Sequence, residues 1–423
     1  MGEPSPVPLA RRLGLSDAVS IGLGSMIGAG LFAAYTPAAV AAGPGLLVGL
    51  VIAASVAYCN ATASAQLAAQ YPTSGGTYVY GRERLGPWWG FVAGWGFVMG
   101  KTASCAAMAL TAATYAVGGD ARARNLLAIA AVVALTLVNL RGITRTAHLA
   151  RVLVSVTVAL LAIVIVVVLL ANRTWHSPVD AIRTSSPYGI LQSAGLLFFA
   201  FAGYARIATL GEEVRDPART IPRAITRALG LVVALYAVVA LVLLVTIGAP
   251  GIAGSPLPLL AAAQQAGVSW VGVVLRLAAV VASLGALLGL IAGVGRTALA
   301  MAREGDLPRH LARVEATSHV PNVAEVVVCS VVVVLIVLTD LRHAIGFSSF
   351  GVLIYYAIAN AAAVSQAPEH RRWPRSLHAV GLAACLLLVL TLPASAVVAG
   401  AVVLAIGVLG RLATRSARFR RAR

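Results

Sequence analysis

Charged residues are scarce in this sequence, and long stretches have none at all. Of 423 residues, 11% are charged and 60% are hydrophobic, and the mean hydropathy is +0.90. Soluble globular domains carry about a quarter charged residues. We therefore expect a single polytopic membrane domain over 1–423, with little room for a separate soluble domain.

Cysteine is also rare, and its placement argues against metal and disulfide chemistry. Four cysteines lie far apart, each inside an apolar stretch: Cys59, Cys105, Cys329 and Cys385. They match no zinc-ligand spacing and suggest no disulfide framework, so we interpret them as small buried hydrophobic side chains. We expect no metal site, no cofactor and no disulfide-linked partner subunit.

The first residues lack the apolar core of a cleavable signal peptide. Residues 1–12 contain three prolines and two arginines but no apolar run, which a signal peptide requires. We interpret this segment as a short cytoplasmic tail.

Acidic residues are few, and the more numerous basic residues gather on one side of the expected membrane. Asp and Glu number 14, Lys and Arg 32, and the formal net charge is +18. Apolar spans of about 20 residues are expected at 15–42, 45–70, 88–117, 125–140, 148–171, 188–210, 225–248, 271–300, 322–338, 343–365, 377–392 and 394–412. Around these spans, 24 Lys and Arg residues fall on the side of both termini and about five on the other.

This bias predicts a multi-pass protein of the plasma membrane with both termini in the cytoplasm. The basic tail 413–423 then lies near anionic lipid, and we expect no nucleic-acid partner.

The first expected span concentrates small residues near its middle. They are Gly22, Gly24, Gly28, Ala29 and Gly30. Each glycine disfavours helix by roughly 1 kcal/mol relative to alanine. A helix broken at membrane depth is tolerated only where its backbone lines a cavity or is buried in protein, and such breaks hold substrate in secondary transporters. The alternative is an unbroken helix that packs closely through Gly24 and Gly28.

The sixth expected span repeats this interruption. Ala202, Gly203, Ala205 and Arg206 lie near the centre of an otherwise apolar stretch. The two interrupted spans open two five-span halves, 15–171 and 188–365, and the spans over 377–412 lie outside them. Interrupted segments at matching positions of two halves indicate the binding site of an inverted-repeat transporter.

Four motifs together resemble those of the amino acid–polyamine–organocation (APC) transporter superfamily, in that family's order. They are GSMIGAGLF at 24–32, YPTSGG at 71–76, FFAFAGY at 198–204 leading to EEVRDP at 212–217, and REGDLP at 303–308. The resemblance covers roughly residues 15–310. It implies an all-α, LeuT-like fold of about 12 transmembrane helices, with two inverted five-helix repeats, two extra helices, and substrate between the first and sixth spans.

The resemblance also implies which groups meet the substrate. Its α-carboxylate would meet the backbone amides of Ile27, Gly28, Ala29 and Gly30, since freed N–H groups at a helix end form an anion site. Its ammonium would face the carbonyls of Met26, Phe199 and Ala202, beside Gly203. Phe199 takes the position of the family's aromatic gate, with simple core packing as the alternative, and Tyr204 would line the same cavity.

The family's usual ion-coupling residues are not matched. Where proton-coupled members carry a lysine in the fifth span, residues 155–157 read Ser-Val-Thr. Where other members carry a glutamate after the sixth-span break, Ala205 stands, and Ser283 is a single hydroxyl for a sodium site. Proton coupling, sodium coupling and exchange all stay open.

Lys101 is the only lysine and lies in the middle of the third expected span. An ionisable group at bilayer depth costs roughly 2.5–3.5 kcal/mol on insertion scales and indicates a function. No Asp, Glu or His is expected at mid-span as its counter-ion. Three interpretations stay open: Lys101 carries the coupling proton, binds an anionic group of the substrate, or is satisfied by backbone carbonyls of a broken helix.

Arg206 lies just past the interruption of the sixth span. We expect it to form a gating or structural ion pair with Glu212 or Glu213, one to two helical turns later.

These observations predict a secondary amino acid permease that works by alternating access, either proton-coupled or as an exchanger. The alternatives are an amine or polyamine transporter and a non-transporting membrane sensor. An amine transporter would need acidic residues in the cavity, and we expect none there. An enzyme is not expected, because the histidines and carboxylates lie in loops or at the ends of spans and form no catalytic group within them.

Overall fold

The chain folds into helices throughout the part that was determined. The computed structural model describes residues 13–73, 75–118, 120–141, 146–177, 185–211, 213–315 and 320–421. Over these residues the one β-bridge is an isolated pair, Leu13 with Val214. Nine stretches of the described residues are long and apolar enough to cross a membrane, and two shorter apolar helices accompany them. The predicted all-α membrane protein is confirmed.

The described residues of the first half of the chain form eight α-helices and one short 3₁₀ turn. They are α1 (Leu15–Met26), α2 (Ala29–Ala33), α3 (Tyr35–Ala42), η1 (Gly43–Gly45), α4 (Leu46–Gln70), α5 (Thr77–Leu85), α6 (Pro87–Val117), α7 (Ala121–Leu140) and α8 (Thr146–Ala171).

The second half begins with another interrupted helix and ends with two long ones. Its elements are α9 (Pro187–Phe201), η3 (Ala202–Tyr204), α10 (Ala205–Ala208), α11 (Pro217–Thr246), α12 (Gly248–Gly254), α13 (Pro258–Gln265), α14 (Ser269–Arg303), η4 (Arg309–Ala312), α15 (Asn322–Leu338), α16 (Leu341–Val364), η5 (Pro368–His370), α17 (Arg375–Thr391) and α18 (Ala394–Arg421). Each of the twelve expected spans falls on one or more of these helices.

Three short helices lie outside the expected spans. The polar helix α5 begins after Gly76 at φ 55° and ends before Gly86 at φ 101°, two left-handed positions that favour glycine. Helices α12 and α13 follow α11, in the segment between the expected spans 225–248 and 271–300. These helices have seven to nine residues, so they are too short to form an apolar run of about 20 residues and were not predicted as spans.

Two long helices extend beyond the expected bounds. Helix α11 begins at Pro217, because proline is well suited to the first turn of a helix. Helix α18 continues to Arg421, so most of the basic tail 413–423 is helical.

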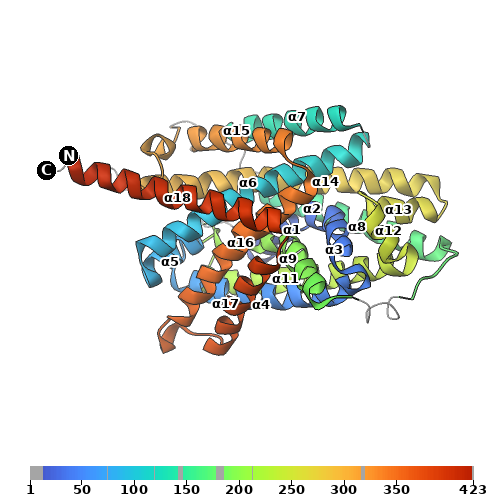
Figure 1. Cartoon of the computed structure of the whole chain (residues 1–423), viewed down its shortest axis with the longest axis horizontal. Helices are drawn as coiled ribbons and strands as arrows, with labels where there is room; N and C mark the ends of the chain where they lie inside the picture. The colour runs from blue at the N-terminus through green and yellow to red at the C-terminus, as the bar shows by residue number, and fades with distance from the viewer. Residues whose placement is uncertain are drawn as a thin grey trace.

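Helix α6 occupies the centre of the molecule, where it packs against α14, α16 and α7. Figure 1 shows α5 and the C-terminal end of α18 at one end of the bundle and α12 and α13 at the opposite end. Helix α15 lies beside α7 on one side of α14. The interrupted helices α1–α2 and α9–α10 lie inside this bundle and contact each other through η3 and α2.

Candidate functional site

The predicted break in the first span is present, and glycine makes it possible. Helix α1 ends at Met26, Ile27 is extended with ψ 90°, and Gly28 (φ −163°, ψ −136°) precedes α2. A Cβ atom on Gly28 would lie 2.7 Å from Met108 Sδ and 3.0 Å from Ala286 Cβ. The break is therefore pressed against α6 and α14, and a larger side chain would force it away from both.

Two of the four predicted carboxylate-binding amides are free. The Ile27 amide donates to the Leu23 carbonyl at 2.8 Å, and the Ala29 amide donates to Met108 Sδ at 3.0 Å. Among the described residues, the amides of Gly28 and Gly30 have no acceptor. These two N–H groups, at the start of α2, are the part of the predicted anion site that the structure leaves open.

The second predicted break is also present. Helix α9 ends at Phe201, and the 3₁₀ turn η3 separates it from the single turn of α10. The Ala202 carbonyl in this turn accepts hydrogen bonds from Lys101 Nζ at 2.9 Å and from Tyr356 Oη at 3.4 Å. Lys101 thus makes the contact expected if backbone carbonyls of a broken helix satisfy its ammonium group. Its roles as proton carrier and as substrate ligand stay predictions.

The two breaks approach each other at van der Waals distance. A Cβ atom on Gly203 would lie 2.3 Å from the Ser25 carbonyl oxygen, and one on Gly30 would lie 2.5 Å from Ala200 Cα. Since these neighbours are backbone atoms, no rotamer change could make room. Glycine at both positions therefore holds the interrupted helices in direct contact.

Tyr236 on α11 links the two breaks, and its role was not predicted. Its hydroxyl lies 2.7 Å from the Met26 carbonyl oxygen and 3.1 Å from the Ala200 carbonyl oxygen, and it has one proton to share between them. The Tyr236 side chain is buried. No sequence signal could have found this role, because a tyrosine in a long apolar span is ordinary.

The carbonyls predicted to face the substrate ammonium are occupied in this conformation. Met26 accepts from Tyr236, Ala202 accepts from Lys101, and Phe199 accepts from the Ala202 amide. An ammonium group would have to share these acceptors or displace their donors. Side chains of α6 and α11 thus reach the broken backbone at Ala202 and Met26, and the contacts of the substrate ammonium stay predictions.

The two aromatic residues predicted for the site are buried. Phe199 is 5% exposed, and the Tyr204 ring packs on Tyr356 with a centroid distance of 5.1 Å. Neither residue lines either of the two cavities described next. Core packing, the alternative for Phe199, describes its observed surroundings, and the roles of Phe199 as a gate and of Tyr204 at the substrate cavity stay predictions.

A cavity of about 200 Å³ opens beside the first break. Ser25 and Ile27 line it at the break, and Arg206, Glu213, Arg296 and Glu325 are the charged residues that line it. A second, much smaller cavity is lined by Ser25, Lys101, Gly203 and Arg206. Polar and charged groups from α6, α10, α14 and α15 thus gather around the end of α1.

The predicted pairing of Arg206 differs in the structure. Arg206 Nη1 donates to Thr209 Oγ1 at 3.1 Å, whereas Glu213 Oε1 accepts from Arg296 Nη1 at 2.7 Å. Helix α10 ends at Ala208, and the following turn directs Glu213 toward α14. In this conformation Glu213 pairs with Arg296 and not with Arg206. The other expected partner, Glu212, lies outside the described residues, so the ion pair of Arg206 stays a prediction.

Glu325 is a cavity residue that sequence reasoning missed. It lies in the first turn of α15, is 2% exposed, and its Oε2 atom has no hydrogen-bond partner among the described residues. Its position at the edge of a span suggested a solvated carboxylate. The expectation that no acidic residue faces the cavity is corrected by Glu213 and Glu325 together.

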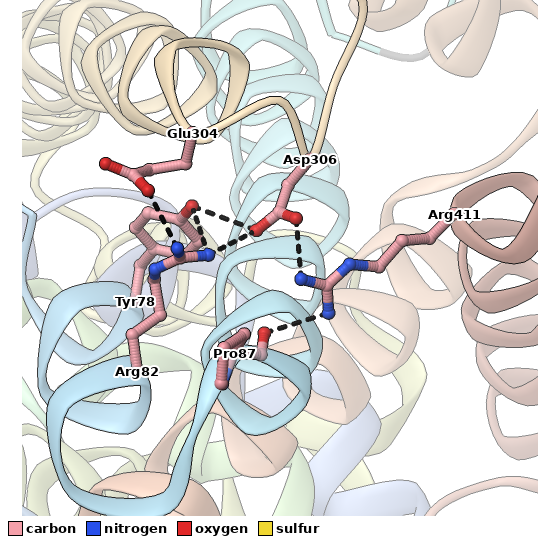
Figure 2. A network of polar contacts seen from close by, with 6 residues as sticks. All are labelled: Tyr78, Arg82, Pro87, Glu304, Asp306 and Arg411. Carbon is pink, nitrogen blue, oxygen red and sulfur yellow. Dashed lines mark hydrogen bonds and ion pairs between the residues drawn. The ribbon is translucent and has the colours of Figure 1, made fainter. Parts of the chain in front are cut away.

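A charged cluster ties three distant segments together at the end of α14, in the REGDLP motif. Figure 2 shows Asp306 between Arg82 and Arg411, with Tyr78 and Glu304 beside Arg82. Asp306 Oδ2 accepts from Arg82 Nη1 at 3.0 Å and from Tyr78 Oη at 3.0 Å, while its Oδ1 lies 2.6 Å from Arg411 Nη2. Arg82 also pairs with Glu304 at 2.7 Å.

Known proteins resemble this chain over most of its length. A family model for amino acid permeases matches residues 13–410. An uncharacterized transporter of Mycobacterium tuberculosis is 56% identical over 98% of this chain and 95% of its own length. The branched-chain amino acid permease BcaP of Bacillus subtilis is 30% identical over 76% of this chain and 73% of its own. A vacuolar cationic amino acid transporter 4 of Arabidopsis thaliana is 28% identical over 75% of this chain and 56% of its own.

Proposed function

Because the chain belongs to the amino acid permease family, we propose that it is a secondary transporter that carries amino acids across the plasma membrane by alternating access. The observation that carries the proposal is the contact between two broken helices. Their breaks leave the Gly28 and Gly30 amides open beside a cavity that reaches Ser25 and Ile27. This arrangement suits an amino acid carboxylate, and interrupted helices are where secondary transporters bind substrate.

The proposed halves, 15–171 and 188–365, move relative to each other in this cycle. Each half opens with one interrupted helix, α1–α2 in the first and α9–α10 in the second. The excess of basic residues on the side of the termini supports a cytoplasmic location for both ends. The larger cavity lies between the break and Arg296, near that basic end of α14, so the described conformation is proposed to face inward.

The proposed substrates are neutral amino acids, with branched-chain residues as the first to test. The buried Lys101 ammonium lies at the second break, and like charge there disfavours a cationic substrate side chain. The name of the Bacillus subtilis relative supports the same choice. Amines are a second candidate, because Glu213 and Glu325 supply carboxylates to the cavity.

Counterflow in proteoliposomes tests this proposal. Vesicles that contain the purified protein are loaded with leucine, arginine, glutamate or putrescine, and entry of a labelled trace of the same compound is followed. We expect accumulation with leucine and none in vesicles without protein. Counterflow with putrescine alone would replace amino acids by amines, and no counterflow from folded protein would favour the non-transporting sensor.

The Lys101→Gln variant separates the three interpretations of this residue. We propose that Lys101 mainly secures the second break through the Ala202 carbonyl. A neutral amide keeps one hydrogen bond but loses its charge assistance, so counterflow should slow at every pH without a change in its pH profile. Loss of pH dependence with retained exchange would instead assign the coupling proton to Lys101. Selective loss of an acidic substrate would assign it to substrate binding.

A further inference from the structure

We propose that Glu325 is the proton-binding group that couples transport to a proton gradient. The proposal rests on the proposed function, since it assigns the coupling ion and its site to that transporter. The site is the carboxyl group of Glu325 at the wall of the larger cavity, and the ligand is one proton.

The surroundings of Glu325 favour its neutral, proton-bound form. The side chain is 2% exposed, and Oε2 has no hydrogen-bond donor among the described residues. Burying an ionised carboxylate is far more costly than burying its neutral form unless the charge is paired. The first turn of α15 offers a helix N-terminus, but its partial charge does not equal a full counter-ion. Desolvation is therefore the larger effect.

The charged groups around Glu325 do not replace the missing partner. Helices α6, α7, α14 and the turn η4 pack against α15. Arg296 on α14 is the basic residue of these elements that lines the same cavity, and its Nη1 atom binds Glu213 at 2.7 Å. Arg206 also lines the cavity and donates to Thr209. Two other basic residues of these helices bind backbone carbonyls: Lys101 that of Ala202 and Arg276 that of Tyr115. Arg122 and Arg124 lie at the start of α7, whereas Asn139, which lines the cavity, lies at its end. The remaining basic residues are exposed: Arg141, Arg303, Arg309 and His310.

The fold makes room for this side chain. A Cβ atom on Gly295 of α14 would lie 2.9 Å from Glu325 Cγ. Any other residue at this position would push Glu325 out of its place. Glu325 therefore packs closely against α14 at Gly295, the residue before Arg296.

The cavity connects this site to the substrate break. Ser25 and Ile27 line one part of it, and Glu325 lines another. Oε2 takes the proton from a hydronium ion, whose broken O–H bond leaves water, and the later return of the proton to water restores the carboxylate. Because a charged Glu325 is costly in this buried place, the side chain is expected to hold the proton while α14 and α15 are packed as they are here.

The experiment uses proteoliposomes in sodium-free buffer with a substrate identified by counterflow. With one proton per substrate, a pH gradient of one unit supports about tenfold accumulation. We expect wild type to accumulate substrate to this extent when the outside is acidic. We expect Glu325→Gln to lose the accumulation while its counterflow, which needs no net proton movement, is retained.

Glu315→Gln is the matched control, because Glu315 lies ten residues earlier and is exposed. Its accumulation should equal that of wild type. Gradient-driven accumulation by Glu325→Gln, or active counterflow without accumulation in wild type, would overturn the proposal and leave the transporter function intact. Absence of counterflow in wild type would overturn both.

If Glu325→Gln also loses counterflow, the Glu325→Asp variant tests whether Glu325 binds the coupling proton. Its shorter side chain moves the carboxyl group while keeping it titratable. We expect a shifted pH profile of uptake with coupling retained, and a profile identical to that of wild type would overturn the proposal.

Discussion

Single atoms determine how the two interrupted helices meet. The approach of Gly203 to the Ser25 carbonyl and of Gly30 to Ala200 leaves no space for a Cβ atom. The hydroxyl of Tyr236 then spans the Met26 and Ala200 carbonyls from a third helix. The backbone groups freed by the two breaks are thereby partly satisfied by side chains, as buried polar groups must be.

Replacing Tyr236 by phenylalanine tests this bridge at the residue scale. The change leaves the buried Met26 and Ala200 carbonyls without this donor, and a buried polar group left unsatisfied costs about 1–3 kcal/mol. We expect the folded protein to be retained, its thermal midpoint to fall, and the counterflow rate to drop roughly tenfold if about 1.4 kcal/mol is lost in the rate-limiting step.

The control is Tyr188→Phe, because Tyr188 is 55% exposed. Equal rates and midpoints for the two variants would show that the Tyr236 hydroxyl does not support the breaks.

At the scale of elements, helix starts are set by local side chains outside the spans. Asp340 precedes α16, and its Oδ1 accepts from the His343 amide at 2.8 Å and lies 2.8 Å from His343 Nδ1. Partial burial would raise the pKa of Asp340, but the His343 contacts lower it more, so it lies below its ordinary value of 3.8. The ionised carboxylate of Asp340 is therefore the form that caps α16.

Asp340→Ala should therefore destabilise α16 in a pH-dependent way. Loss of an N-cap costs about 0.5–2 kcal/mol, and we expect a lower thermal midpoint in detergent at pH 7. A carboxylate whose folded pKa is lowered stabilises fully above its unfolded pKa and loses that contribution as pH falls through the folded value. The difference between variant and wild type should be present at pH 7 and shrink as the pH falls below the ordinary pKa of Asp340.

Asp340→Asn is the matched variant, since asparagine also caps helices. It should stay close to wild type at pH 7. A loss as large as that of alanine would mean that the charge of Asp340, and not its cap, stabilises this end of α16.

At the scale of the whole molecule, the cluster in Figure 2 joins α5, the end of α14 and α18. The Arg411 side chain is 1% exposed and also donates to the Pro87 carbonyl at 2.8 Å. Its guanidinium lies 4.5 Å from the centroid of the Trp88 ring. A helix outside the two proposed halves is thus attached to the start of α6, the central helix.

Arg411→Ala should loosen this attachment. Removing one partner of a buried ion pair costs about 3–5 kcal/mol, although Arg82 still neutralises Asp306. We expect a clear fall in the thermal midpoint in detergent, and Arg411→Lys should recover only part of it because lysine lacks the planar fork and stacks poorly.

The exposed Arg309 provides the control. Arg309→Ala should melt like wild type, and an Arg411→Ala midpoint equal to that of Arg309→Ala would exclude a stabilising role for the cluster.

Sequence alone was enough to predict the class of fold and both helix breaks, and each expected span falls on helix. These features follow from local patterns: apolar runs of membrane length, and glycines whose helix cost is concentrated at two points. The places of Gly28, Gly30 and Lys101 at the breaks were also predictable, since free backbone groups and a buried ammonium both require partners, while their roles in transport stay predictions.

Only the tertiary structure decided which partners those groups find. Tyr236 reaches Met26 across 210 positions of sequence, and Arg411 reaches Pro87 across 324. Glu213 turned to Arg296 instead of Arg206, and Glu325 was buried although it begins a span. The physical reason is that hydrogen bonds, ion pairs and desolvation depend on distance in space, and helix packing sets that distance in ways that no local pattern records.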